Sequence, residues 1–588
     1  ISRTKYLLFL KDYAVRGRLI SFFLVINFFS ILLYDFFLFF GVNEIYLKIL
    51  IILLILVGFY KPDNIQNLFK KFILINNKSK LLLFIIILGY FLISLLPITD
   101  PDSLDYHLTF PYLSLINENF FIQNEWFTSQ LAGAGEALII FGLSINAYKL
   151  SSILQFVALF SIIVAILNLK YEKHNLNLNN KILVCLAILC IPSFLFLTFT
   201  AKPQLFPIAT NFIAFLMTFF ILPFEKNDKK FITIFCIISF LCFSATQFKF
   251  SFFLSSGIIL LFAYTELFKR KLLLKGFLIS LFFFIIIVSP REFFDFQYLS
   301  QDIIKNFFSP ATDNYATESF ISSLKHGPGN PRYLPYWIFL PYNQNGFSPS
   351  VVTEIVGLSV LIFLVNFKFK PIKKIVYASL IFFILAIPSG QPTGRFFIEP
   401  FLWLTVGSIF YLNLKNNLLF RVSEKLIIIN SIIIFIAISF TVFTFIPGIF
   451  SIKNHKIILG KYANGYHLYQ WANKNLPENS VILTTHRSYL FSENPFVSYD
   501  FRLYVRTQEE LNHYIDSVVK KKPTHLLYNS IDYDNTQDVF KNCRGKLVIK
   551  GKNVHQTSKR NPFGNVQKLH DGYIYKIDLD KLKKCKNY

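Results

Sequence analysis

Long apolar stretches separated by short polar segments recur along the chain from Leu19 to Ile446. A helix needs about 20 mostly apolar residues to cross a hydrocarbon core roughly 30 Å thick. The stretches are too long for membrane strands, and their polar and apolar positions do not alternate. We therefore predict an all-α polytopic membrane protein with spans near 19–40, 46–60, 81–97, 150–169, 182–199, 204–223, 231–247, 251–267, 273–289, 351–366, 373–388, 396–413 and 425–446.

The charges between these stretches predict an orientation. The chain has 588 residues, is 54% hydrophobic and carries a formal charge of +25. Its Lys and Arg residues gather in alternate loops, such as 61–80 and 368–374, on the same side as the basic N-terminus. The positive-inside rule makes that side cytoplasmic. Thirteen crossings then place the C-terminal end outside, in the periplasm of a bacterial inner membrane. Because the basic residues form no stripe on a soluble fold, we exclude nucleic acid as a partner.

This topology divides the chain into two parts. Residues 1–447 form the transmembrane module, with outer loops at 98–149 and 290–350. The apolar stretch 135–146 is too short to span, and we assign it to the first outer loop as a helix in the membrane interface. Residues 448–588, called the tail below, alternate helix (460–475, 507–520) and strand (481–485, 525–528, 546–549, 573–577). They predict a small α/β domain, in which Cys543 and Cys585 could pair if the tail is extracytoplasmic.

The first outer loop opens with an acidic motif, Thr99 to Leu108. Asp100 followed by Pro101 is typical of a helix N-cap and first helical residue. Asp102 also has a structural explanation, because carboxylates in a first turn suit the helix dipole. The whole cluster predicts more than capping. Its carboxylates, Tyr106 and His107 lie at the lip of a membrane cavity and indicate a polar ligand site.

Four isolated basic residues lie on the predicted outer side, where basic residues are otherwise scarce: Lys202, Lys249, Arg291 and Arg395. Cations at membrane depth are costly and are usually paired or functional, although any single one could extend to the lipid headgroups. Arginine offers a planar fork that matches phosphate, and lysine offers a point charge. Together they predict a site for an anionic headgroup.

Several segments resemble a known family in their order along the chain. The Asp102–Leu108 pattern D-x-L-x-Y-H-L is similar to the first outer loop of GT-C fold glycosyltransferases. Later segments resemble uncharacterised bacterial members of that family. They are Gly135-Glu136, the turns at Lys202-Pro203 and Lys249, Arg395–Pro400 and, in the tail, Trp471–Leu483. The resemblance covers most of the chain and implies a GT-C-like transmembrane module with a periplasmic domain.

The resemblance also implies a chemistry. This superfamily includes protein O-mannosyltransferases and the aminoarabinose transferase of lipid A, which use a polyprenyl-phosphate-linked sugar and a catalytic aspartate that maps to Asp102. An inverting transfer would then use Lys202 and Arg395 against the leaving phosphate and Asp102 as the base. Arg291 would contact the donor phosphate, while Asp105, Tyr106 and His107 would position acceptor or sugar. Gln204 departs from the pattern, because many relatives carry an acidic residue there.

Other functions stay open at this point. A flippase or transporter of lipid-linked sugars would carry charges near the middle of its spans, whereas an O-antigen polymerase or ligase would rely on Arg and His in a large outer loop. A structural envelope protein with a decayed site is a third alternative. The acceptor is a lipid, glycan or protein, and membrane lipids surround the chain. No cofactor is certain; a divalent cation stays open, since Asp100 and Asp102 are too few ligands to predict a metal site.

Overall fold

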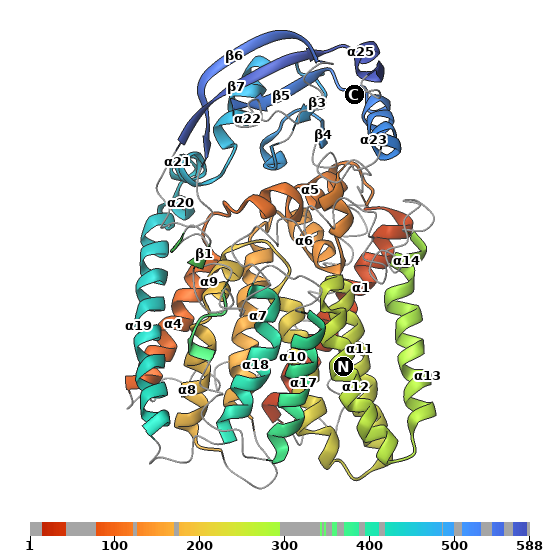
Figure 1. Ribbon diagram of the computed structural model, residues 1–588, viewed down its shortest axis with the longest axis vertical. Coiled ribbons are helices and arrows are strands. Elements are labelled where there is room, and N and C mark those ends of the chain that lie inside the picture. The colour runs from red at the N-terminus through yellow and green to blue at the C-terminus, as the bar shows by residue number, and fades with distance from the viewer. Residues whose placement is uncertain are drawn as a thin grey trace.

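A computed structural model describes residues 14–42, 78–120, 126–169, 176–294, 342–343, 346–347, 355–360, 370–386, 394–410, 418–484, 486–498, 508–530, 544–557 and 568–584. The chain forms a layer of roughly parallel helices with the tail at one end of that layer (Figure 1). We call this end the tail-facing end and the other the far end. The predicted span 46–60, most of 351–366 and of the loop 290–350, and both Cys543 and Cys585 lie outside the described residues.

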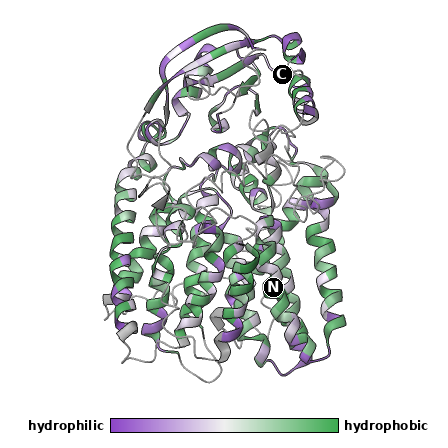
Figure 2. Cartoon of the chain, viewed as in Figure 1, coloured by the Kyte–Doolittle hydropathy of each residue, from purple (hydrophilic) through white to green (hydrophobic). Residues whose placement is uncertain are grey.

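Apolar side chains dominate the helices of the layer, whereas the tail mixes polar and apolar residues (Figure 2). The uniformly apolar sequences predict burial in lipid or among neighbouring helices, because no polar face is left for water. The helices of the layer are α1 (Ala14–Phe40), α4 (Lys78–Ser94), α7 (Leu150–Leu167), α8 (Leu178–Leu189), α9 (Pro192–Phe199), α10 (Leu205–Phe220), α11 (Asp228–Phe248), α12 (Phe253–Lys269), α13 (Leu273–Phe283), α14 (Ser289–Phe294), α17 (Lys370–Ala386), α18 (Ile398–Gly407) and α19 (Leu418–Phe445).

The predicted count of thirteen spans is not met. Among the described residues, seven helices are long and apolar enough to cross a membrane, or eight if the bent pair α8 and α9 counts as one. The chain bends by 65° between that pair, where Pro192 begins a new helix and cannot continue the hydrogen bonding of the old one. The predicted spans 81–97, 373–388 and 396–413 correspond to α4, α17 and α18, which have 17, 17 and 10 residues.

Two short helices lie between the layer and the tail: α5 (Thr109–Ile116) and α6 (Ala134–Ser144) (Figure 1). The stretch 135–146 is therefore a short helix and not a span, as predicted. It differs from a helix floating in the membrane interface, because most of its residues are buried against α5 and α1. Gly133 permits this packing, since a Cβ there would come within 2.7 Å of the carbonyl oxygens of Gln247 and Phe248.

The tail begins with α20 (Pro447–Phe450), α21 (Ile452–Tyr462) and α22 (Tyr466–Asn475). The predicted helix 460–475 is therefore not continuous: it is broken before α22, where Gly465 adopts a left-handed conformation. A five-stranded sheet follows in the order β4-β3-β5-β7-β6. β3 pairs in parallel with β4 and β5, whereas β7 is antiparallel to β5 and β6. The strands are β3 (Ile482–Thr484), β4 (Phe496–Ser498), β5 (His525–Asn529), β6 (Arg544–Thr557) and β7 (Lys568–Ile577), with helices α23 (Gln508–Lys520) and α25 (Leu579–Lys584).

The predicted strands of the tail are confirmed as β3, β5, β6 and β7, and the predicted helix near 507–520 as α23. β4 was missed, because three residues in a polar context give no periodic signal. A two-residue ladder, β1 (Tyr342–Asn343) with β2 (Gly346–Phe347), lies apart from this sheet.

Candidate functional site

The acidic motif forms a capped turn at the tail-facing end. As predicted, Asp100 caps it: its Oδ2 accepts hydrogen bonds from the backbone N of Ser103 (2.8 Å) and from the Ser103 hydroxyl (2.7 Å). The same hydroxyl accepts a bond from the backbone N of Ala201 at 3.0 Å. Residues Ser103–His107 then follow a π-helical turn, a geometry that is frequent at functional sites. The turn therefore fixes the acidic motif beside the segment that carries Lys202.

Asp102 and Lys202, 100 residues apart, form an ion pair in this corner. Lys202 Nζ lies 2.5 Å from Asp102 Oδ2 and 3.6 Å from Asp100 Oδ1. The Lys202 side chain is only 2% exposed, whereas that of Asp102 is 14% exposed. A buried ammonium is tolerated only when carboxylates compensate its lost hydration. The pair thus presents a partly accessible carboxylate on a buried cation.

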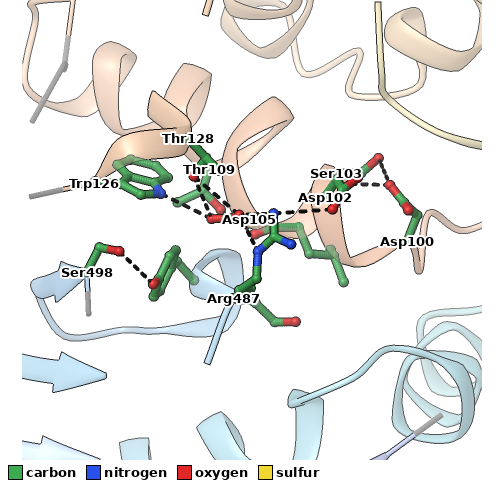
Figure 3. A network of polar contacts seen from close by, with 12 residues as sticks. Asp100, Asp102, Ser103, Asp105, Thr109, Trp126, Thr128, Arg487 and Ser498 are labelled. Atoms are coloured by element: carbon green, nitrogen blue, oxygen red, sulfur yellow. Dashed lines mark hydrogen bonds and ion pairs between the residues drawn. The ribbon is translucent and has the colours of Figure 1, made fainter. Parts of the chain in front are cut away.

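Asp105 occupies the buried side of the same turn and is saturated with donors (Figure 3). Its carboxylate accepts bonds from Trp126 Nε1 (3.1 Å) and from the Thr128 hydroxyl (3.3 Å). Arg487, which belongs to the tail, adds Nε at 2.8 Å and Nη2 at 2.7 Å to Asp105 Oδ2. The same Nη2 lies 3.2 Å from Asp102 Oδ1. Asp105 is fully buried, so its charge is balanced inside the protein and not by water.

His107 and Glu136 join the motif to helix α6. His107 Nδ1 lies 2.6 Å from Glu136 Oε1, and Glu136 Oε2 accepts the backbone N–H of Gly133 at 2.8 Å. Burial lowers the pKa of His107, although the bond to Glu136 opposes this. Gly135, one residue before Glu136, contacts Pro203 so closely that a Cβ would overlap the proline ring. The segments Asp102–Leu108, Gly135-Glu136 and Lys202-Pro203, which carry the resemblance described above, are thus packed together.

A second group of cations lies near this corner. Burial, together with the positive charges of Arg395 and Lys202, lowers the pKa of Lys249 to about 8, while Glu136 and Asp102 oppose the change. These five charged groups are therefore close enough to interact. Arg395 Nε and Nη1, together with Gln247 Nε2, are buried donors that have no hydrogen-bond partner among the described residues. Unpaired buried donors cost free energy, and an anionic acceptor bound here would satisfy them.

The remaining predicted residues take other positions. Arg291, on α14, donates from Nη1 to the Tyr34 hydroxyl (2.8 Å) and to the Ala132 carbonyl (2.9 Å). These contacts hold α14 against α1 and the start of α6. Tyr106 is buried and stacks against His107 with ring centroids 3.8 Å apart. The roles predicted for Arg291, Asp105, Tyr106 and His107 at a substrate stay predictions.

A metal ion does not fit the described part of the site. No group of three or more His, Cys, Asp or Glu residues in the described segments could hold one. Asp100 and Asp102 are instead engaged by Ser103, Lys202 and Arg487. An apolar cavity between α1, α7 and α10, lined by residues such as Leu19, Leu169 and Phe220, carries no polar chemistry.

Sequence reasoning missed Arg487, Trp126 and Thr128. Trp126 and Thr128 lie in the same outer loop as the motif. An indole or a hydroxyl in an acidic loop is only a weak indication of a hydrogen-bond donor to a carboxylate. Arg487 follows β3 in the polar run His486-Arg487-Ser488. The carboxyl end of a parallel strand is a common place for functional side chains, but nothing in the sequence links that strand to residue 102.

The fold and the site define a class: a multi-pass helical membrane protein whose C-terminal α/β domain caps an acidic motif at one end of the helices. The chain belongs to the DUF1420 family. The family model of the DUF1420 N-terminal domain matches residues 57–459, and that of the DUF1420 C-terminal domain matches residues 460–588. The two models meet within α21. None of the curated proteins matches the chain.

Proposed function

We propose that this protein is a membrane glycosyltransferase that moves a sugar from a polyprenyl-phosphate donor to an acceptor. The observation that carries the proposal is the Asp102 corner, where a partly exposed carboxylate lies between a buried Lys202 and Arg487. This corner lies where the membrane helices meet the tail. A lipid-linked substrate can reach such a place from the bilayer, while a polar acceptor reaches it from water.

Asp102 is the proposed base. The acceptor hydroxyl gives its proton to the Asp102 carboxylate as its oxygen bonds to the anomeric carbon of the sugar. The bond between that carbon and the phosphate oxygen breaks on the opposite face, and the phosphate leaves with the electron pair. The product has inverted stereochemistry. Of the motif's three aspartates, Asp102 suits this role because Asp105 is fully buried and Asp100 caps the turn.

The leaving phosphate needs positive charge, because it departs as an anion and requires no proton. Lys202 and Arg395 are the proposed donors to it, with Lys249 nearby. The unpartnered Nε and Nη1 of Arg395 and the Nε2 of Gln247 support this assignment, since preorganised donors stabilise charge that develops in a transition state. The surrounding apolar helices would hold the polyprenyl tail.

The proposal includes an orientation. The Lys-rich loops at the far end make that side cytoplasmic, so the Asp102 corner and the tail lie outside the cytoplasm. We propose a GT-C-like arrangement in a bacterial inner membrane, in which the shorter apolar helices α4, α17 and α18 cross beside the seven or eight long spans. Nucleotide sugars are absent outside the cytoplasm, so a transferase that acts there needs another sugar donor. A lipid-linked sugar is such a donor.

The test is mass spectrometry of envelope glycolipids and glycoproteins from cells with the gene, without it, and complemented by the Asp102→Asn variant. A transferase predicts a glycosylated product that disappears without the gene and is not restored by Asp102→Asn. If deletion changes only the distribution of lipid-linked sugar across the membrane, with no covalent product lost, the protein is a flippase or transporter. Loss of a polymer length or attachment, with the monomer transfer intact, would favour a polymerase or ligase.

A further inference from the structure

The tail contributes one charged side chain to the Asp102 corner. Arg487 lies in the loop after β3, 382 residues beyond Asp105, and its guanidinium reaches both carboxylates of the acidic motif (Figure 3). Nε and Nη2 contact Asp105 Oδ2, and Nη2 also lies 3.2 Å from Asp102 Oδ1. An arginine donates in a fixed planar fork. Holding Asp105 with one edge therefore fixes where Nη2 meets Asp102.

Asp102 is thereby held at both oxygens. Lys202 Nζ contacts Oδ2 at 2.5 Å and Arg487 Nη2 contacts Oδ1 at 3.2 Å. The first contact comes from the helical layer and the second from the tail. A carboxylate with a single partner can rotate about its last side-chain bond, whereas two partners on opposite oxygens restrict that rotation. Arg487 thus adds a restraint on the orientation of Asp102 that comes from the tail.

The loop that carries Arg487 is built into the interface. Trp126 packs edge-on against Tyr489 and Phe496, with ring centroids 5.7 Å and 5.3 Å apart, and those two rings stack on each other at 4.2 Å. The Ser488 hydroxyl donates to the Asn464 carbonyl. Leu490 packs against Leu108 and Ala201 of the helical module. The indole of Trp126 also donates to Asp105, so aromatic packing and the ion pair reinforce one position.

We propose that Arg487 is a positioning residue for Asp102, and that docking of the tail completes the catalytic site. This inference rests on the proposed function, because it takes Asp102 as the base. A merely structural Arg487 would tie the tail to the acidic loop without affecting how Asp102 handles a proton. The two possibilities differ in the pH dependence of transfer, since a nearby cation favours the ionised form of a carboxylate.

The charged and titratable groups around Asp102 come from four elements. They are Asp100, Asp105 and Tyr106 on its own loop, Lys202 before α10, Lys249 after α11 and Arg487 from the tail. Replacing Arg487 by glutamine removes the one cation that the tail contributes and keeps an N–H donor at that position. A base must be deprotonated to act, so the acidic limb of the pH–rate profile should move to higher pH by about one unit.

The experiment compares full-length wild type, Arg487→Gln, Arg487→Lys and Leu490→Ala in proteoliposomes that contain the lipid-linked sugars and acceptors extracted from the cell envelope. We expect Arg487→Gln to lower kcat at least tenfold at neutral pH, to shift the acidic limb upward, and to leave KM for the lipid donor within twofold. Arg487→Lys should restore part of the rate. Leu490→Ala, which weakens the docking contact without changing charge, should leave the limb in place.

Two results would overturn the inference. One is an Arg487→Gln profile whose acidic limb coincides with that of wild type in a protein with a native melting temperature. The other is an Arg487→Lys profile whose acidic limb lies as high as that of Arg487→Gln, because restoring the cation should move the limb back toward the wild-type position. If Asp102→Asn also transfers sugar at the normal rate, the proposed base is wrong. If the wild-type protein transfers no sugar, the proposed function fails. If Asp102→Asn is inactive while Arg487→Gln is normal, only the role of Arg487 fails.

Discussion

The two ends of the helical layer carry ion pairs of opposite character. At the far end, Glu266 contacts Lys269 at 2.7 Å and Lys374 at 2.6 Å, and the two lysine side chains are 56% and 45% exposed. At the tail-facing end, Lys202 is 2% exposed and contacts Asp102 at 2.5 Å. Both sets of pairs are short, so contact distance alone does not distinguish them. Exposure does.

This difference separates two uses of charge. An exposed pair is screened by water and contributes about 0 to 1 kcal/mol. A buried pair loses the hydration of both ions, and breaking it by removing one partner costs about 3 to 5 kcal/mol. The tail-facing end combines such pairs with unpartnered donors on Arg395 and Gln247. Its charges are therefore better explained by chemistry than by stability.

The largest expected effect is at Asp102. Asp102→Asn removes the proposed base and keeps the size of the side chain, so transfer should fall about 10²- to 10⁴-fold. The matched control is Asp228→Asn, which breaks the far-end pair with Arg270, where Asp228 is 71% exposed. Both variants should reach the membrane at the wild-type level by immunoblot. Equal transfer rates for the two variants would show that the carboxylates at the two ends do not differ in their contribution to sugar transfer.

Acid should weaken the tail and spare the far end. Burial, with His570 nearby, lowers the pKa of His555 to about 4, and burial also lowers that of His486, whose ring lies 4.7 Å from His555. The unfolded chain binds these protons from about pH 6.5 downward while the folded chain does not, so stability falls between pH 6.5 and 4. His555 alone contributes about 3 kcal/mol across that window.

Hydrogen exchange measures this response. Exchange in β6 and β7 should rise between pH 7 and pH 5, after correction for the intrinsic rate, while exchange in α12 and α13 stays constant. A His555→Gln variant should respond less to the same change. If exchange rises equally in the tail and at the far end, the buried imidazoles do not cause the acid response. The same conclusion follows if the His555→Gln variant responds as strongly as the wild-type protein.

Gly135 tests the close packing of the motif segments. A methyl group there overlaps Pro203, so Gly135→Ala should destabilise the protein by about 1 to 3 kcal/mol. The matched control is Gly257→Ala on α12, where a Cβ meets nothing within 4 Å and alanine gains about 0.5 to 1 kcal/mol in a helix. Thermal unfolding in one detergent should therefore move in opposite directions. Shifts of the same sign would contradict the packing account.

Arg395 tests the anionic subsite. Arg395→Ala should raise KM for the lipid donor roughly tenfold, which corresponds to about 1.4 kcal/mol, and should also lower kcat, because the same guanidinium stabilises the leaving phosphate. The control is Arg421→Ala on α19, an exposed arginine at the far end, which should leave KM unchanged. Steady-state rates at varied donor lipid distinguish the two. An unaltered KM in Arg395→Ala would remove its phosphate-binding role.

The smallest effect is expected at Lys374. Lys374→Ala breaks an exposed contact with Glu266, which keeps its second contact with Lys269. The loss should stay below about 1 kcal/mol and vanish in high salt. Thermal unfolding at low and high ionic strength measures it. A loss as large as that from Gly135→Ala would place a structurally important pair at the far end as well.

The sequence predicted the parts of this account that depend on local pattern. Apolar length located helices such as α1, α10 and α11, and the polar motif at 99–108 identified Asp100 as a cap. The span count failed where helices bend or end early, as at Pro192, because hydropathy measures composition and not continuity. Arg487 could not be predicted, because its contact with Asp105 depends on how the tail docks onto the membrane module.

The central claim is that Asp102 takes a proton while a polyprenyl phosphate leaves. The most direct measurement is the mass-spectrometric ratio of polyprenyl phosphate to its sugar-linked form, in proteoliposomes that contain purified protein and envelope-derived donor and acceptor. We predict that wild-type protein raises this ratio with time and that Asp102→Asn leaves it at the protein-free level, while Asp228→Asn matches wild type. Equal release of polyprenyl phosphate by wild type and Asp102→Asn would contradict the account.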